Sequence, residues 1–161
     1  MTSRPRLLAR RIALVVGLLV GPGLVSTAAP AQAYTPSAAT TAAFEARVIY
    51  QINVQRTRYG RAKLAARYCP DVYAEARAAY LARTGYFYHQ SLTPILRSCH
   101  ATRAAENLAR GWPSADKTVF AWMASPSHRA NVLDPLLTRI GVGAVYAHGQ
   151  WTVVTEFTRS S

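Results

Sequence analysis

Two histidines and a glutamate are the residues of this sequence whose types could do chemistry together. His89 closes an aromatic cluster, Glu106 stands in an apolar context, and His128 follows a Ser-Pro-Ser break. Two imidazoles and a carboxylate could jointly bind a divalent ion, or they could simply hydrogen-bond one another. Their separations of 17 and 22 residues are not a local metal signature. Spacing alone therefore favours satisfied polar groups over a metal site.

The other carboxylates mostly fall where a helix start would use them. Negative charge is favourable in a first helical turn, and four acidic residues lie in such expected turns: Glu45, Asp71, Glu75 and Asp116. Glu106 has no such role, so we expect it to be paired or functional. The sequence contains no GxSxG, HExxH, phosphate-cradling glycine loop or EF-hand pattern. Those enzyme and metal classes are therefore not indicated.

Helices are expected over most of the chain that precedes the last twenty or so residues. Apolar spacing, Ser and Pro at helix starts and Gly at helix ends set their bounds. They are predicted at about 41–59, 70–84, 93–98, 115–125 and 128–133. The buried face of the second helix is predicted to carry Val72, Ala76, Ala79 and Tyr80. Residues 105–111 are expected to be extended.

The end of the sequence predicts a β-hairpin. Apolar residues alternate along 139–147 and again along 151–158, around the turn at 148–150. Gly141 and Gly143 share one face of the first strand, where another element must pack closely. Helices followed by a hairpin predict an α+β fold, with helices layered on a small antiparallel sheet.

The first 33 residues have the composition of an export signal. A basic start is followed by an apolar run over 12–20 and by Ala-Gln-Ala at 31–33. That run is shorter than the roughly 20 residues needed to span a bilayer. We therefore expect cleavage after Ala33, a leader over 34–42, and a secreted protein without a transmembrane anchor. An uncleaved anchor is the alternative, and the general secretory route is favoured over the twin-arginine route.

Charge and cysteines fit an extracellular location. Four of the 19 basic residues and none of the seven acidic ones lie in residues 1–33, which leaves a net charge of +8. Anionic lipids or envelope polymers are expected partners, and nucleic acid is not. The basic residues are scattered singly, as on a solvated surface. Cys69 and Cys99 are the two cysteines, and an even count in an exported chain favours a disulfide over a metal pair.

Several motifs together resemble a known family. His89 is followed by AENLARG, then WMASPSHRANVL, then RIGVGAVY and WTVVTEFT. This order is similar to the bacterial branch of the CAP superfamily, which includes cysteine-rich secretory proteins, antigen 5 and plant pathogenesis-related group 1 proteins. The upstream INVQRTRYGRAKL resembles the first helix of that family. The resemblance runs from about residue 44 to 157 and implies an α-β-α sandwich, with a CAP domain over 43–161.

The resemblance also implies a surface cleft. Relatives hold two histidines and two glutamates there, and some bind zinc. The matching residues are His89, Glu106 and His128, with Ser125 at the position of the remaining glutamate. This three-residue site, together with Ser125 and water, could still hold zinc, but more weakly. The possible metal ligands are His89 and His128. Three further residues are expected to support the cleft: Asn53, Asn107 and Arg129.

Three functions are compatible with these residues. The first is a monomeric, non-enzymatic module that binds a lipid or cell-envelope ligand. Residues 86–88 are a candidate apolar groove, although core packing is expected for at least two of the three. The second is a metal-dependent extracellular hydrolase in which Glu106 is the base and His89 and His128 hold the metal. The third is an adhesive envelope protein that binds anionic polymers through its basic surface. We expect the first.

Overall fold

The computed structural model describes residues 34–160. The expected signal peptide at 1–33 and its cleavage site lie outside the described residues. Five helices and four strands follow one another. The helices are α1 (Ala38–Arg58), α2 (Tyr68–Thr84), α3 (Thr93–Ser98), α4 (Ala115–Ala124) and α5 (Pro126–Leu133). The strands are β1 (Ala65–Ala66), β2 (Ala101–Arg110), β3 (Arg139–Ala147) and β4 (Gln150–Ser160).

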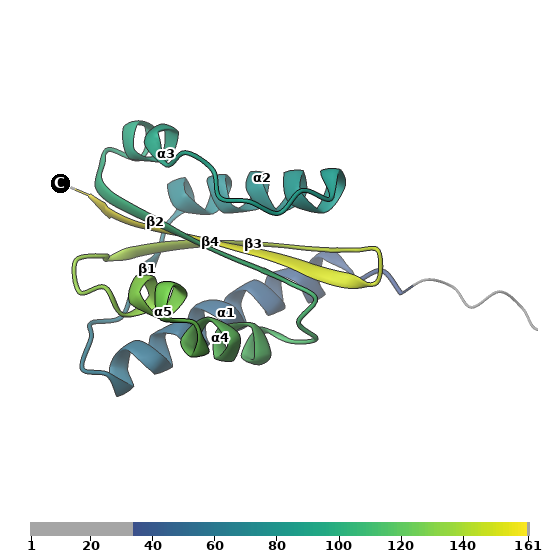
Figure 1. The fold of residues 1–161 in the computed structure, drawn as a ribbon, viewed down its shortest axis with the longest axis horizontal. Helices are drawn as coiled ribbons and strands as arrows, with labels where there is room; N and C mark the ends of the chain where they lie inside the picture. Colours follow the sequence, from purple (N-terminus) through teal and green to yellow (C-terminus); the bar gives the residue numbers. More distant parts are fainter. Residues whose placement is uncertain (1–33, 161) are drawn as a thin grey trace, which may run out of the picture. The chain divides into compact units, whose positions relative to one another are not determined.

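These elements form three layers (Figure 1). The sheet lies in the middle, with α2 and α3 over one face and α1, α4 and α5 over the other. The α+β class and the α-β-α sandwich predicted from the sequence are therefore confirmed. Both sheet faces are covered, so side chains pointing either way from β4 are buried.

The sheet has the strand order β1-β3-β4-β2. The β3–β4 hairpin and the β2–β4 pair are antiparallel, as expected. The two-residue β1, in contrast, pairs in parallel with β3, which makes the sheet mixed. Asn53 explains this pairing, because its side chain holds the residue before β1. Asn53 Nδ2 donates to the carbonyl of Leu64 at 3.0 Å, and the amide of Leu64 donates back to Asn53 Oδ1 at 2.8 Å.

Helix boundaries follow local capping residues. Ser114 caps α4 through the amide of Lys117, as expected. Ser37 accepts from the amide of Thr40 and starts α1 at Ala38, so the helix includes part of the segment expected as a leader. Pro126 begins α5 directly and Ser125 is its N-cap residue, whereas the sequence predicted a helix that starts at 128.

Helix α2 packs very closely on β3. A Cβ added at Gly141 would lie 2.1 Å from the amide nitrogen of Asp71, and one at Gly143 would lie 2.4 Å from the carbonyl of Ala74. The expected close approach at the two glycines is therefore confirmed. The expected buried face of α2 is wrong, because Val72, Ala76 and Ala79 are exposed. The face that meets the sheet carries Ala74, Ala78 and Leu81.

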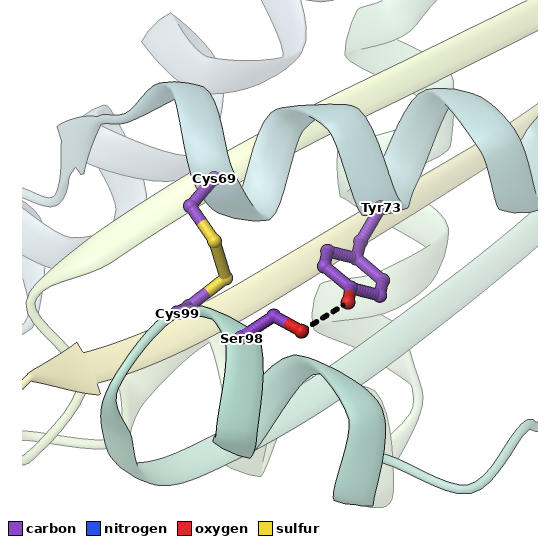
Figure 2. The surroundings of a disulfide bond; sticks show 4 residues. All are labelled: Cys69, Tyr73, Ser98 and Cys99. Carbon is purple, nitrogen blue, oxygen red and sulfur yellow. Dashed lines mark hydrogen bonds between the residues drawn. A yellow bond between two sulfur atoms is a disulfide. The ribbon is translucent and has the colours of Figure 1, made fainter.

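A disulfide joins α2 to the end of α3 (Figure 2). Cys69 and Cys99 are bonded with their Cα atoms 5.7 Å apart, as predicted. Next to them, the hydroxyl groups of Tyr73 and Ser98 are hydrogen-bonded at 2.7 Å. Helix α3 is therefore fixed covalently to α2, and the chain enters β2 from a defined position.

The larger part of the core lies between the sheet and the helices α1 and α4. It contains Ile52, Val119, Trp122, Val153 and Phe157 among its fully buried side chains. In the described part of the chain, residues 34–160, no helix combines the length and the apolar character that crossing a membrane requires.

Candidate functional site

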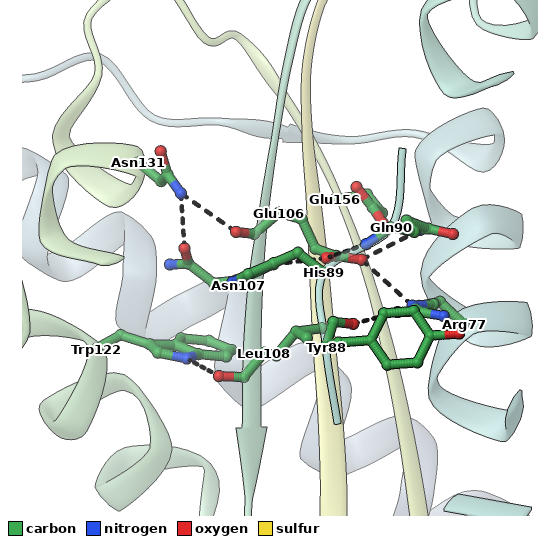
Figure 3. A network of polar contacts seen from close by, with 10 residues as sticks. All are labelled: Arg77, Tyr88, His89, Gln90, Glu106, Asn107, Leu108, Trp122, Asn131 and Glu156. Atoms are coloured by element: carbon green, nitrogen blue, oxygen red, sulfur yellow. Dashed lines mark hydrogen bonds and ion pairs between the residues drawn. The ribbon is translucent and has the colours of Figure 1, made fainter. Parts of the chain in front are cut away.

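Glu106 lies at the centre of the candidate site, on the edge strand β2. Its carboxyl group is buried on the side of the sheet that faces α2. His89, in the segment between α2 and α3, approaches from the surface. Its Nδ1 lies 2.7 Å from Glu106 Oε1, while most of the imidazole is open to solvent (Figure 3). The structure thus brings these two predicted site residues into direct contact.

Other protein groups also contact the carboxyl group of Glu106. The amide of Gln90 donates to Oε1 at 3.4 Å, and Gln90 Nε2 donates to Oε2 at 3.1 Å. The buried guanidinium of Arg77 forms an ion pair with Oε2, with Nε at 3.7 Å. Both carboxylate oxygens therefore face protein donors. These contacts fix the orientation of the carboxyl group.

A second carboxyl group, Glu156 on β4, completes the buried network. Glu156 is fully buried and is the cross-strand partner of Glu106. Gln90 Nε2 donates to Glu156 Oε1 at 2.8 Å as well as to Glu106. Burial, followed by the negative charge of Glu106, raises the pKa of Glu156 to about 9. Glu156 is therefore a neutral carboxylic acid near neutral pH.

His128 reaches the same region from the opposite helical layer. Successive residues of a strand point to opposite faces, so Asn107 points toward α5 while Glu106 points toward α2. Asn107 Nδ2 donates to the backbone carbonyl of His128 at 3.1 Å, and Asn131 Nδ2 donates to Asn107 Oδ1 at 2.9 Å. The Glu-Asn pair of β2 thus positions one histidine on each side of the sheet edge.

The two imidazole rings are near each other but separate. The centroids of His89 and His128 lie 6.5 Å apart. His128 is half-buried, and that burial, together with the nearby charge of His89, lowers the pKa of its imidazole. A neutral ring at neutral pH has one nitrogen free to accept a hydrogen bond.

The other expected site residues contact different parts of the molecule. Ser125 ends α4, and its hydroxyl lies 3.4 Å from that of Ser127. Arg129 was expected to support the cleft, but its guanidinium lies over the ring of Tyr59 at 4.8 Å. Asn53 supports the turn before β1 rather than the cleft.

The residues present do not fit a zinc ion in this arrangement. Two imidazole rings that bind one tetrahedral zinc through Zn–N bonds of about 2.0–2.1 Å have centroids about 5 Å apart. The rings of His89 and His128 are farther apart than that. Within residues 34–160, no group of three or more His, Cys, Asp or Glu side chains is placed to hold a metal.

A surface hollow of about 320 Å³ lies beside this network. Its walls include His89, Gln90, Glu106 and Asn131. A ligand there would meet the open edge of His89 and amide groups rather than a free carboxylate. This arrangement suits hydrogen bonding to a ligand better than proton abstraction.

Three exposed aromatic residues precede the site. Tyr86, Phe87 and Tyr88 follow the end of α2 without regular secondary structure. The core packing expected for at least two of them is wrong, because all three are exposed. Two arginines hold their backbone. Arg110 donates to the carbonyl of Tyr86 at 3.1 Å, and Arg77 donates to the carbonyl of Tyr88.

Comparison with known proteins shows which family this chain matches. The family model described as "CAP: Cysteine-rich secretory protein family" matches residues 49–157. The chain belongs to the CAP family. The resemblance inferred from the motifs around His89, Glu106 and His128 is therefore confirmed at the level of the family.

Relatives of this CAP protein occur in other bacteria. The uncharacterized protein YkwD of Bacillus subtilis (strain 168) is 31% identical over 134 residues, which cover 79% of this chain and 52% of YkwD. The chain thus spans about half the length of that curated relative. An extracellular SCP-domain protein of Bacillus anthracis str. Ames has a TM-score of 0.65 at 24% identity, over 80% of this chain and 45% of that one. An outer surface protein of Borrelia burgdorferi has a TM-score of 0.71 at 17% identity, over 80% of this chain and 98% of that one. These two structures share the fold.

Three members of the buried network in this CAP protein were not predicted from the sequence: Arg77, Gln90 and Glu156. Gln90 follows His89 directly, and this position next to a candidate site residue could have indicated that Gln90 belongs to the site. Arg77 lies four residues before Leu81 on the buried face of α2, but the wrong choice of that face hid it. Glu156 carries no local signal, because its burial depends on α2 covering β4.

Proposed function

We propose that this CAP domain is a secreted, non-catalytic module that binds an anionic lipid surface through residues 86–88. The observation that carries the proposal is the exposure of three consecutive aromatic side chains. Tyr86, Phe87 and Tyr88 are 62%, 47% and 51% exposed. Contiguous exposed apolar groups commonly mark sites of protein or membrane interaction. The composition of residues 1–33 and the extracellular location stated for the Bacillus anthracis neighbour support secretion.

Arginine side chains lie directly against these aromatic rings. Arg77 lies 4.8 Å from the centroid of the Tyr88 ring, and Arg110 lies 4.8 Å from that of Phe87. Tyrosine and arginine have apolar bodies and polar ends, so both suit the boundary between lipid and water. Arg77 itself is buried and paired with Glu106, so the net positive charge of the chain attracts anionic headgroups while the exposed rings can enter the headgroup region. The net charge of +8 without residues 1–33 supports an anionic partner.

The binding function is favoured over a hydrolase because of Glu106. A metal-dependent hydrolase would need this carboxylate as the base that activates bound water. Glu106 instead accepts from His89 and Gln90 and pairs with Arg77. These contacts make its carboxyl group part of the structure that holds the segment carrying residues 86–88.

Sedimentation with lipid vesicles tests the proposal. We expect the protein to sediment with vesicles that contain phosphatidylglycerol and less with pure phosphatidylcholine. Binding should partly persist at about 1 M salt, where the Debye length is only about 3 Å, because inserted rings do not depend on charge attraction. The double variant Tyr86→Ser/Phe87→Ser should lose the salt-resistant part.

Phe120 provides a matched control. It is an exposed aromatic residue on α4, in the layer across the sheet from α2. Phe120→Ser should therefore bind vesicles as the unmodified protein does. Binding that disappears entirely at high salt and is unaffected by Tyr86→Ser/Phe87→Ser would overturn the proposal, and would indicate attraction of anionic polymers or lipids by net charge alone.

A further inference from the structure

A second hollow lies at the far end of the sheet from β1, around the tip of the β3–β4 hairpin. Its volume is about 470 Å³, within the range of small-molecule sites. The start of α1, the loop before α4 and the hairpin all contribute to its walls. It shares no lining residue with the hollow beside Glu106.

Aromatic rings form both the floor and the rim of this hollow. In the floor, Phe44 stacks on Trp151 with centroids 4.3 Å apart, and Tyr146 meets Trp151 edge-on at 5.2 Å. These contacts between neighbouring rings hold the three rings in position. At the rim, Trp112 is 41% exposed and Tyr34 is 65% exposed. A flat ligand therefore finds a rigid floor and two accessible rings.

The lining is uncharged. None of the described residues around the hollow is Asp, Glu, Lys, Arg or His, although the chain carries 19 basic residues. A charged ligand would lose hydration there without gaining an ion pair. The hollow therefore selects a neutral ligand, in contrast to the basic surface around residues 86–88.

Neutral polar groups are also present in the lining. The side-chain amide of Gln150 has no hydrogen-bond partner among residues 34–160, and it lies over Gly111. The hydroxyl oxygen of Ser114 accepts from the amide of Lys117, which leaves its proton available to donate. An amide with both a donor and an acceptor, next to a hydroxyl group, matches a ligand that carries several hydroxyl groups.

We propose that this hollow binds a neutral sugar ring, as a unit of a polysaccharide. The C–H bonds on one face of a pyranose carry partial positive charge, and the face of an aromatic ring is negatively polarised. The sugar stacks on the ring of Trp112, and its hydroxyl groups bond to Gln150 and Ser114. This site goes beyond the proposed lipid-binding function and involves different residues.

Calorimetric titration of the purified protein tests this site with triacetylchitotriose and maltotriose as neutral probes and trigalacturonate as an anionic probe. We expect saturable binding of at least one neutral trisaccharide and none of trigalacturonate. Trp112→Ala should weaken binding at least ten-fold, about 1.4 kcal/mol. Gln150→Ala should weaken it while leaving every aromatic ring in place.

Two control variants separate this site from other surfaces. Phe120→Ala removes an exposed ring outside the hollow, and Tyr86→Ser/Phe87→Ser removes the proposed lipid contact. Both should bind the trisaccharide unchanged. The proposal is overturned if neither neutral trisaccharide binds saturably, if trigalacturonate binds equally well, or if Trp112→Ala has no effect. Failure of vesicle binding leaves this result unaffected, so the two proposals stand or fall separately.

Discussion

Glu106 and Glu156 face each other across β2 and β4, and Gln90 donates one hydrogen bond to each of them. Like charges directly opposite each other on adjacent strands are destabilising. The guanidinium of Arg77 is the positive charge beside this pair, and its Nε lies 3.7 Å from Glu106 Oε2. The pair therefore retains one proton near neutral pH, and the raised pKa of Glu156 places that proton on the more deeply buried carboxyl group.

Stability should fall with rising pH because of Glu156, and Glu156→Gln should remove this dependence. The folded-state pKa is about 9, whereas the ordinary value is 4.5. Between these values the native state holds a proton that the unfolded state has lost, so the stabilisation is complete below the lower value and is lost toward the upper one. The expected slope is about −1.4 kcal/mol per pH unit. Urea unfolding at several pH values within this window measures it.

Glu156→Gln keeps the shape of the side chain and cannot ionise. We expect a flatter pH profile and a higher free energy of unfolding at neutral and alkaline pH. A variant whose profile runs parallel to that of the unmodified protein would show that the retained proton lies elsewhere.

Zinc should not bind stoichiometrically near neutral pH. The rings of His89 and His128 are too far apart to share one tetrahedral ion as they are placed. Calorimetric titration with zinc should therefore give no saturable one-to-one isotherm, and His128→Ala should leave the trace unchanged. A one-to-one isotherm that disappears in His128→Ala would mean that the two rings move together to bind the ion.

Removing the disulfide should destabilise the fold. Cys69 and Cys99 are 30 residues apart, and opening a loop of that size lowers the free energy of unfolding by roughly 3.5 kcal/mol on the chain-entropy model. Urea unfolding of Cys69→Ala/Cys99→Ala measures this loss. The unmodified protein under reducing conditions should unfold at about the same urea concentration as the variant. Equal stability of variant and unmodified oxidised protein contradicts the expectation.

Gly143→Ala should destabilise the contact between α2 and β3 by about 1–3 kcal/mol or more, as overpacking does. The added Cβ would lie 2.4 Å from the backbone carbonyl of Ala74. Because the clash involves backbone atoms, adding Ala74→Gly should not restore stability. Thermal unfolding of the single and double variants measures both effects, and a restored midpoint in the double variant would place the clash at the side chain instead.

Local signals were sufficient to predict much of the fold. Ser114 and Pro126 set the bounds of α4, and Gly85 ends α2 in a left-handed conformation. Alternating apolar residues predicted the hairpin, and the two glycines of β3 predicted a close neighbour. Each of these signals depends on a few adjacent residues, so no knowledge of distant contacts was needed.

Burial that depends on distant contacts was not predictable from the same signals. Isolated arginines were expected on the surface, yet Arg56 and Arg77 are buried. Arg56 donates to the carbonyls of Val132, at the end of α5, and of Leu137, in the loop that follows, both far along the chain. Helix α2 carries alanines on several of its faces, so the pattern of small apolar residues did not identify which face is buried. In the candidate site, the order of motifs predicted Glu106. The burial of Glu156 could be recognised only in the structure, where α2 covers β4.

The position of β4 within the sheet has a consequence for when this protein can fold. β4 pairs with both β2 and β3, although it follows every other strand in the sequence. A chain still emerging from the ribosome therefore lacks the strand that joins the two halves of the sheet. Folding must wait until residues 150–160 are available, and pairing over such long separations is slow. The sheet of a chain with this topology is incomplete until synthesis has passed β4.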